Sequence, residues 1–154
     1  MPAYWLFKSE PDVFSWDMLV AKRDAGEPWE GVRNYLARNN MRKMQIGDLG
    51  FFYHSNIGLE IVGVCAVTAL SHLDASDGTG RWDCVDVKAV AALPRPVTLA
   101  SVKDNPKLAS MSLVTSMRLS VQPVTPDEWA EVCRMAGLKG KVAQVAKSKA
   151  EHVK

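Results

Sequence analysis

Three short clusters of polar and aromatic residues are the part of this 154-residue chain that could do chemistry. Each combines aromatic or apolar side chains with amide, hydroxyl or charged groups. The clusters are Lys8-Ser9-Glu10-Pro11, Trp29 to Asn34 running into Arg38-Asn39-Asn40, and Phe51 to Asn56. A flat ring can stack on Trp, amides can read the edge of that ring, and Arg can hold the flanking phosphates. The combination predicts a site for a single extruded nucleobase and its phosphates.

Positive charge gathers between Gly31 and Gly47, a segment without a single acidic residue. Its four bases are Arg33, Arg38, Arg42 and Lys43. The whole chain carries only +2, and residues 139–154 hold five lysines and one acid, so the first 138 residues have 14 bases against 16 acids. Because each phosphate contact adds a salt-dependent contribution to affinity, the acid-free segment is the better candidate for binding phosphates. Alternatively, its arginines form only the solvated side of a short helix.

Sequence patterns of common enzymes and metal sites are absent. There is no GxSxG, P-loop or GxGxxG motif, and no CxxC or HxxxH spacing. His54, His72 and His152 are isolated, and His54 at a strand end is as compatible with a structural role as with a ligand. Cys65 and Cys84 fall in expected strands, where Cys is usually a small buried side chain. We therefore expect no catalytic centre, no metal and no cofactor.

Composition and length describe an ordinary folded domain. The chain is 47% hydrophobic and 23% charged, which excludes disordered, collagenous and coiled-coil proteins. No apolar run approaches the ~20 residues that span a bilayer, and the N-terminus lacks the pattern of a secretory signal. Three Cys form an odd number, which fits reduced thiols. We expect a cytoplasmic protein without a membrane partner; the oligomeric state is not indicated.

Short strands and helices must position the clusters. The strands expected from apolar runs and period-two alternation are Tyr4–Lys8, Leu49–His54, Ile61–Ala69, Trp82–Val90 and Met117–Val121. The expected helices are Trp16–Asp24 with Ser15 as N-cap, Asn34–Met44, Leu99–Lys103, and one that a capping box opens at Thr125 and Gly137 ends. Pro94-Arg95-Pro96 is expected to be a loop. Without βαβ alternation, this order predicts an α+β fold with a small, mostly antiparallel sheet closed into a barrel.

Tryptophan is over-represented, at five of twelve aromatic residues. The spacing of Trp5, Trp16 and Trp129 within their expected elements assigns them to the core. Trp29 differs because it lies in a loop flanked by Gly and Pro with polar neighbours. Composition leaves Trp29 open between the core and a pocket wall.

The same clusters resemble the EVE domain family, the thymocyte nuclear protein 1-like group. The matching segments are Tyr4–Pro11, Trp29–Asn40, Ile46–Leu49, Phe51–Asn56, Ile61–Gly63, Leu93–Val97 and Leu119–Thr125. The resemblance implies one domain over residues 1–138 and leaves residues 139–154 as a basic, flexible tail. It also implies a PUA-like β-barrel flanked by short helices and related to the YTH readers of methylated adenine.

The resemblance further implies a reader of modified cytosine in DNA that takes one flipped base into an aromatic pocket. Trp29 would form one wall, and Trp82, which follows a loop shorter than the family's usual insertion, a second. The residues implied for the pocket are Lys8, Ser9, Glu10, Trp29, Val32, Arg33, Asn34, Tyr53, His54, Ser55, Asn56, Trp82 and Ser120. Those expected to lie toward the phosphates are Arg38 and Asn39, with Arg42 and Lys43 of the same basic segment.

The first hypothesis is thus a non-catalytic reader whose partner is a nucleic acid with a modified base. A methyl group contributes only about 1–3 kcal/mol of discrimination in an apolar site, so a modest preference is expected. Modified RNA is an alternative ligand, because PUA-like folds often bind it. A small-molecule enzyme that uses His54 or Cys65 in the same pocket, and a partner-binding module with a vestigial pocket, are further alternatives.

Overall fold

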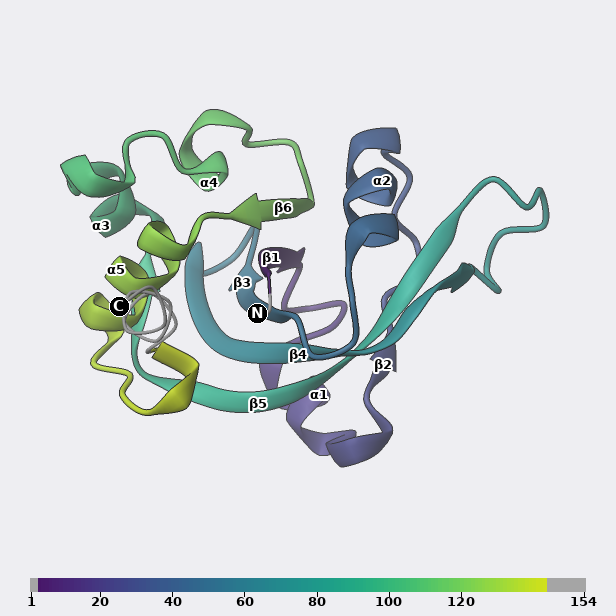
Figure 1. Cartoon of the computed structure of the whole chain (residues 1–154), viewed down its shortest axis with the longest axis horizontal. Helices are drawn as coiled ribbons and strands as arrows, with labels where there is room; N and C mark the ends of the chain where they lie inside the picture. Colours follow the sequence, from purple (N-terminus) through teal and green to yellow (C-terminus); the bar gives the residue numbers. More distant parts are fainter. Residues whose placement is uncertain (1–2, 144–154) are drawn as a thin grey trace, which may run out of the picture.

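A computed structural model describes residues 3–143 of the chain and contains one six-stranded sheet in the order β2-β5-β4-β3-β1-β6 (Figure 1). The strands are β1 (Tyr4–Ser9), β2 (Glu27–Pro28), β3 (Leu49–His54), β4 (Glu60–Leu73), β5 (Asp83–Thr98) and β6 (Val121–Val124). Neighbouring strands are antiparallel except β1 and β3, which are parallel. The predicted α+β class is confirmed, and the predicted barrel takes the form of a curled sheet with β2 and β6 at its edges.

Short helices flank this sheet. They are α1 (Trp16–Ala21), α2 (Tyr35–Lys43), α3 (Leu99–Asp104), α4 (Ser112–Thr115) and α5 (Pro126–Ala136), with 3₁₀ turns at Arg23–Ala25, Pro106–Leu108 and Lys141–Ala143. Ser15, Asn34 and Thr125 each accept a hydrogen bond from the backbone N–H three residues on, which satisfies a free donor of the first turn. The capping box of Thr125 and Glu128 is confirmed, and Gly137 ends α5 in the left-handed conformation.

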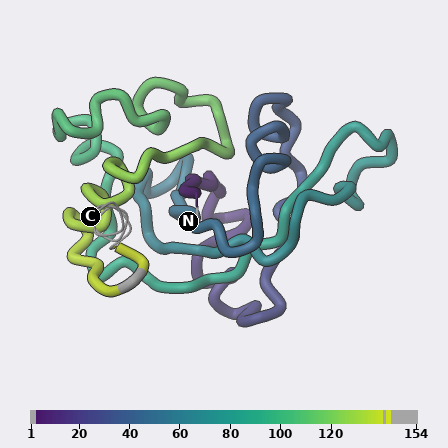
Figure 2. Tube along the Cα trace, in the orientation of Figure 1, coloured from purple at the N-terminus to yellow at the C-terminus, as the bar shows by residue number. Residues whose placement is uncertain are grey.

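Long, bent strands shape the molecule. The pairing of β4 with β5 changes register four times, and each irregularity lets the two strands twist and bend. Figures 1 and 2 show their joined ends projecting away from the body as an arm, which we define as residues 69–86. The helices α3, α4 and α5 gather at the opposite end of the sheet.

Two predicted boundaries are wrong because tertiary context overrides the local pattern. Residues 94–96 belong to β5: between the pairs Ile61–Val97 and Gly63–Ala92 the register slips, so prolines there interrupt no regular ladder. Met117 is exposed and lies in a turn rather than in a strand. The strand begins only at Val121, and its Pro123 is tolerated because β6 is an edge strand.

Two hydrophobic cores lie on opposite faces of the sheet, because alternate side chains of a strand point to opposite sides. Tyr4 stacks on Trp129 of α5 in one core, with ring centroids 4.6 Å apart. Trp5 and Trp16 belong to the other core, and the Trp5 Nε1 donates to buried Asp48 over 3.0 Å. The assignment of Trp5, Trp16 and Trp129 to the core is confirmed.

Parts of the predicted basic tail and His152 lie outside the described residues. Among residues 3–143, no helix has the length and hydrophobicity that crossing a membrane requires. The three Cys side chains are all buried free thiols.

The contact between Gly63 of β4 and the Trp16 ring generates a stability prediction. A Cβ at residue 63 would lie 2.5 Å from ring atoms of Trp16, so the ring or the strand must move. We expect Gly63→Ala to lower the free energy of unfolding by roughly 1–3 kcal/mol, measured by urea denaturation. Gly78→Ala is the matched control, because nothing lies within 4 Å of its added Cβ. Equal stability of the two variants would contradict this packing.

Candidate functional site

A cavity of about 500 Å³ opens between the end of β1, the turn after it and the segment from β2 to α2. That volume lies within the usual range of ligand sites, about 300–1,000 Å³. Its wall mixes apolar, aromatic and charged side chains, as sites that recognise one small group usually do. The lining residues are Lys8, Ser9, Glu10, Val13, Phe14, Glu27, Pro28, Trp29, Glu30, Gly31, Val32, Arg33 and Ser120.

Trp29 belongs both to the core and to the cavity wall. Its side chain is only 8% exposed. Three rings contact it edge to face: Phe7 at 5.4 Å, Phe14 at 6.0 Å and Phe52 at 5.7 Å between centroids. Its backbone N–H donates to Val85 of β5 over 2.7 Å. The ring is therefore fixed in place, so a ligand that stacks on it need not order it first.

The loop from Trp29 to Arg33 is tied to the arm by the carboxylate of Asp74. One carboxylate oxygen accepts from the Gly31 backbone N–H at 2.8 Å and from Arg33 Nη1 at 3.0 Å. The other accepts from the Ser76 backbone N–H at 2.7 Å. Asp74 itself is 1% exposed. A single buried group thus holds one side of the cavity against the arm.

The charge of Asp74 is stabilised by the same contacts. Burial alone would raise its pKa, but hydrogen bonds from Ser76, the Gly31 backbone and Arg33 outweigh burial and lower the pKa to about 2. The carboxylate is therefore ionised at neutral pH and can hold the Arg33 guanidinium in a charge-assisted hydrogen bond.

The end of β1 forms the opposite side of the cavity. The Lys8 backbone N–H donates to Ser120 at 2.9 Å, and its ammonium donates to the carbonyl of Met117 and lies 6.0 Å from the centroid of the Tyr53 ring. Burial lowers the pKa of Lys8. The carboxylate of Glu10 accepts from Asn56 at 3.0 Å. These contacts fix polar groups at this edge.

Seven of the residues predicted for the pocket line the cavity together: Lys8, Ser9, Glu10, Trp29, Val32, Arg33 and Ser120. The sequence analysis missed six other lining residues: Val13, Phe14, Glu27, Pro28, Glu30 and Gly31. The turn after β1 brings Val13 and Phe14 to the site, because both donate their backbone N–H to the carbonyl of Glu10 over 2.9 Å. Pro11 closely follows β1 and has no backbone N–H to donate to a strand, so it was the signal in the sequence for that turn.

Six predicted pocket residues are not among those that line the cavity: Asn34, Tyr53, His54, Ser55, Asn56 and Trp82. Asn34 caps α2, and Asn56 holds Glu10 in place. His54 Nε2 accepts from the Trp16 backbone N–H at 3.1 Å, and burial lowers the pKa of His54. This histidine is therefore a neutral group with a structural hydrogen bond. Cys65 is fully buried, and burial raises its pKa to about 12.

Trp82 takes part in a separate surface cluster of two aromatic rings and two arginines, which we call the Arg–aromatic cluster: Arg33, Tyr35, Arg38 and Trp82. Tyr35 and Trp82 stack with centroids 4.8 Å apart and an interplanar angle of 28°. The Arg38 guanidinium lies 4.8 Å from the Tyr35 centroid, and that of Arg33 lies 5.6 Å from Trp82. Since Arg33 also lines the cavity, the cluster continues the site onto the surface.

The four residues predicted to lie toward the phosphates are all on α2, and they are not equivalent. Arg38 Nε and Nη2 donate to the side chain of Asn39, and Lys43 is exposed. Arg42 instead forms an ion pair with Asp83 of β5. Its charge is partly offset, so Arg38 and Lys43 are the better placed cations of this helix.

We expect Asp74→Asn to lower the free energy of unfolding by roughly 1–3 kcal/mol at pH 7, because it removes the charge that holds Arg33 and Gly31. The pKa of about 2 lies below the ordinary value, so the Asp74 contribution is complete above about pH 4 and is lost as pH falls through 2. Urea denaturation between pH 2 and 7 measures both effects. Asp24→Asn is the control, since Asp24 is 98% exposed and its pair with Lys88 is a surface ion pair. A pH profile of Asp74→Asn parallel to that of the native protein would contradict the role of Asp74.

Comparison with known proteins gives consistent results. The family model of the EVE domain matches residues 3–135. Thymocyte nuclear protein 1 of Mus musculus is 34% identical over 158 residues, covering 82% of this chain and 70% of that protein. A crystal structure of a protein from Agrobacterium tumefaciens is 64% identical with a TM-score of 0.87, covering 88% of this chain and 94% of that one.

A second structure is the crystal structure of human THYN1 protein in complex with 5-methylcytosine containing DNA. It is 31% identical to this chain with a TM-score of 0.81, and covers 90% of this chain and 99% of its own. The match of the family model over most of the sequence, with these relatives in sequence and structure, shows that the chain belongs to the EVE domain family.

Proposed function

We propose that this protein is a non-catalytic reader of a modified base in DNA, and that the base is a modified cytosine held flipped out against Trp29. The observation that carries the proposal is the complex of the human relative with 5-methylcytosine containing DNA. The cavity beside Trp29 supports it with a rigid aromatic wall, an apolar side and a polar edge.

The polar edge suits a base with an exocyclic amino group. Three acidic residues, Glu10, Glu27 and Glu30, line the cavity, against two cations, Lys8 and Arg33, of which Arg33 is paired with Asp74. A carboxylate accepts well from the amino group of cytosine but repels a phosphate. The cavity therefore favours the base itself and leaves the phosphates outside. Flipping costs a few kcal/mol, which stacking on Trp29 would offset.

The apolar side gives a reason to prefer the modified base. Val13, Phe14, Pro28 and Val32 contribute apolar or aromatic surface to the wall. A methyl group on the pyrimidine ring adds apolar area that such a wall removes from water. The gain is about 1–3 kcal/mol, so unmodified DNA is expected to bind more weakly rather than not at all.

Phosphates would be held by cations outside the cavity. Arg38 of the Arg–aromatic cluster is one of these cations, and Lys43 lies further along α2, whereas Arg33 itself lines the cavity and is paired with Asp74. Guanidinium groups at such positions orient the backbone without reading sequence. In this proposal Trp29 stacks on the base and Arg38 contacts phosphate. Two experiments distinguish these roles.

We expect Trp29→Leu to weaken binding of a duplex containing one 5-methylcytosine by roughly 10- to 100-fold, because stacking contributes about 1–3 kcal/mol per base. Fluorescence anisotropy with modified DNA, unmodified DNA and a matched RNA measures the affinities. Trp16→Leu is the matched control, since Trp16 is buried in the same core but does not line the cavity. Equal affinity of the native protein for modified and unmodified DNA would overturn the proposal. Tighter binding of the RNA than of either DNA would identify RNA as the ligand and overturn the proposal of a DNA reader.

The second experiment tests the phosphate contact. We expect Arg38→Gln to weaken binding of modified and unmodified DNA by the same factor and to lower the salt dependence, the slope of log affinity against log salt, by about 1. Arg134→Gln on α5 removes the same charge far from the cavity, where Arg134 pairs with Glu131. An unchanged slope in Arg38→Gln, or an equal change in Arg134→Gln, would exclude a direct contact of Arg38 with phosphate.

A further inference from the structure

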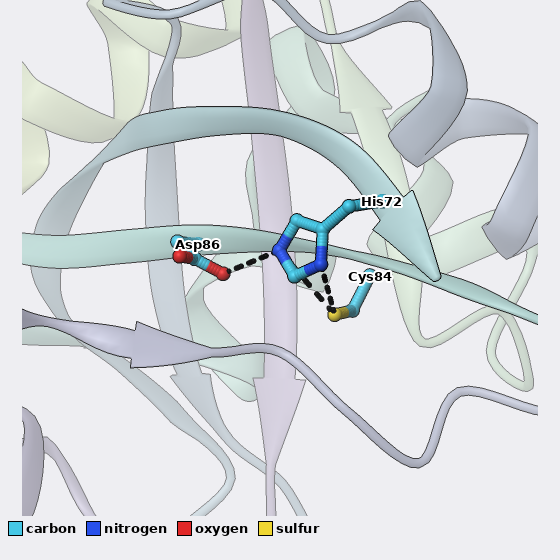
Figure 3. Close-up of side chains that lie close together, drawn as sticks. All are labelled: His72, Cys84 and Asp86. Atoms are coloured by element: carbon cyan, nitrogen blue, oxygen red, sulfur yellow. Dashed lines mark hydrogen bonds and ion pairs between the residues drawn. The ribbon is translucent and has the colours of Figure 1, made fainter. Parts of the chain in front are cut away.

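His72, Cys84 and Asp86 lie together on the arm, outside the cavity lining (Figure 3). Their ligand atoms, one nitrogen, one sulfur and one oxygen, are all within 4.8 Å of one another. In the sequence they looked unrelated. The register of the arm pairs His72 with Cys84 across the two strands, and Asp86 follows on the same face of β5.

The two separations that involve His72 are close to those between ligands of one metal ion. Cys84 Sγ lies 3.8 Å from His72 Nε2. A tetrahedral Zn²⁺ with a nitrogen at about 2.0 Å and a sulfur at about 2.3 Å separates them by about 3.6 Å. The His72 Nε2 to Asp86 Oδ1 distance is 2.9 Å and would open by a few tenths of an ångström. The side chains of His72 and Asp86 are partly exposed, at 46% and 32%, so they have room to move apart by that amount.

The orientation of the His72 ring also fits a ligand. Its Nδ1 lies 3.2 Å from the carbonyl oxygen of Leu73. A carbonyl only accepts, so this contact places a proton on Nδ1. Nε2 faces the Asp86 carboxylate, which also only accepts, so an ion would bind at Nε2 in place of a proton; Cys84 Sγ lies 3.8 Å from both ring nitrogens. Metal-binding histidines in proteins are typically held in this way by a backbone carbonyl or a carboxylate.

The charge around Cys84 favours a cation. Cys84 lies within the electrostatic reach of four carboxylates, those of Asp74, Asp86, Glu30 and Asp83. The carboxylates that oppose a thiolate attract a divalent ion, and an ion in contact with the sulfur deprotonates it outright. Binding would therefore release protons to the solvent.

We propose that His72, Cys84 and Asp86 form a binding site for a divalent transition metal of the zinc class, with one ligand atom from each. The combination of a thiolate and an imidazole selects zinc-like ions over magnesium and calcium, which prefer oxygen. Three protein ligands leave a fourth position open. The ion would join β4 to β5 within the arm. Because its ligand His72 lies two residues before Asp74, the ion would also stiffen the support of the cavity loop.

Co²⁺ is the probe, because a cobalt–thiolate bond gives a near-ultraviolet absorption band that reports the sulfur directly. Titration of the reduced full chain should give a band that saturates at one Co²⁺ per chain and that added Zn²⁺ removes. We expect the band to disappear in Cys84→Ser and Co²⁺ binding to weaken by roughly 10-fold or more in His72→Ala and Asp86→Asn. Cys65→Ser and Cys133→Ser are matched controls, because both are buried thiols remote from the cluster.

A band that persists in Cys84→Ser, or the lack of any band with the native chain, would overturn the proposal. Should Cys84→Ser fail to fold, His72→Ala decides alone, because His72 is exposed and its removal leaves the core intact. Unchanged Co²⁺ affinity in His72→Ala would equally overturn it. None of these readouts depends on DNA binding, so the metal site and the reader function are tested separately.

Discussion

Asp74 joins two parts of the chain that are far apart in sequence, the loop from Trp29 to Arg33 and the arm. Its carboxylate is buried, so leaving it without partners would be costly. The Gly31 backbone, Arg33 and Ser76 meet at this carboxylate and satisfy it. The position of the cavity wall therefore follows from the need to solvate one charge. Everything proposed for the site depends on this loop staying where Asp74 holds it.

The cavity wall and the core share side chains in this protein. Trp29 lines the cavity, and Phe7 and Phe52, from the parallel strands β1 and β3, contact its ring. A rigid wall obtained in this way costs no ordering of a mobile ring on binding. The corresponding constraint is that the ring cannot be altered for a new ligand without disturbing the core beneath it.

Local signals in the sequence were sufficient for much of the fold. The caps at Ser15 and Thr125 are chemical features of a few neighbouring residues, and both are found where expected. Register between distant strands is not local. It decides that residues 94–96 continue a strand and that His72 meets Cys84. The same limit applies to the cavity, whose clusters were visible in the sequence, whereas the turn that adds Phe14 was not.

The arm stands apart from the body (Figure 2), and it is held to the cavity loop by the contact of Asp74 with Gly31 and Arg33, besides those of Ser76 with Arg33 and Val85 with Trp29. Residues 77–81 beyond that contact are mostly exposed. Surface loops tolerate insertions far better than strands do. The end of the arm can therefore lengthen or shorten among related proteins while Asp74 keeps the loop in register. Such changes would place new side chains beside the Arg–aromatic cluster without any change in the wall that Trp29 forms.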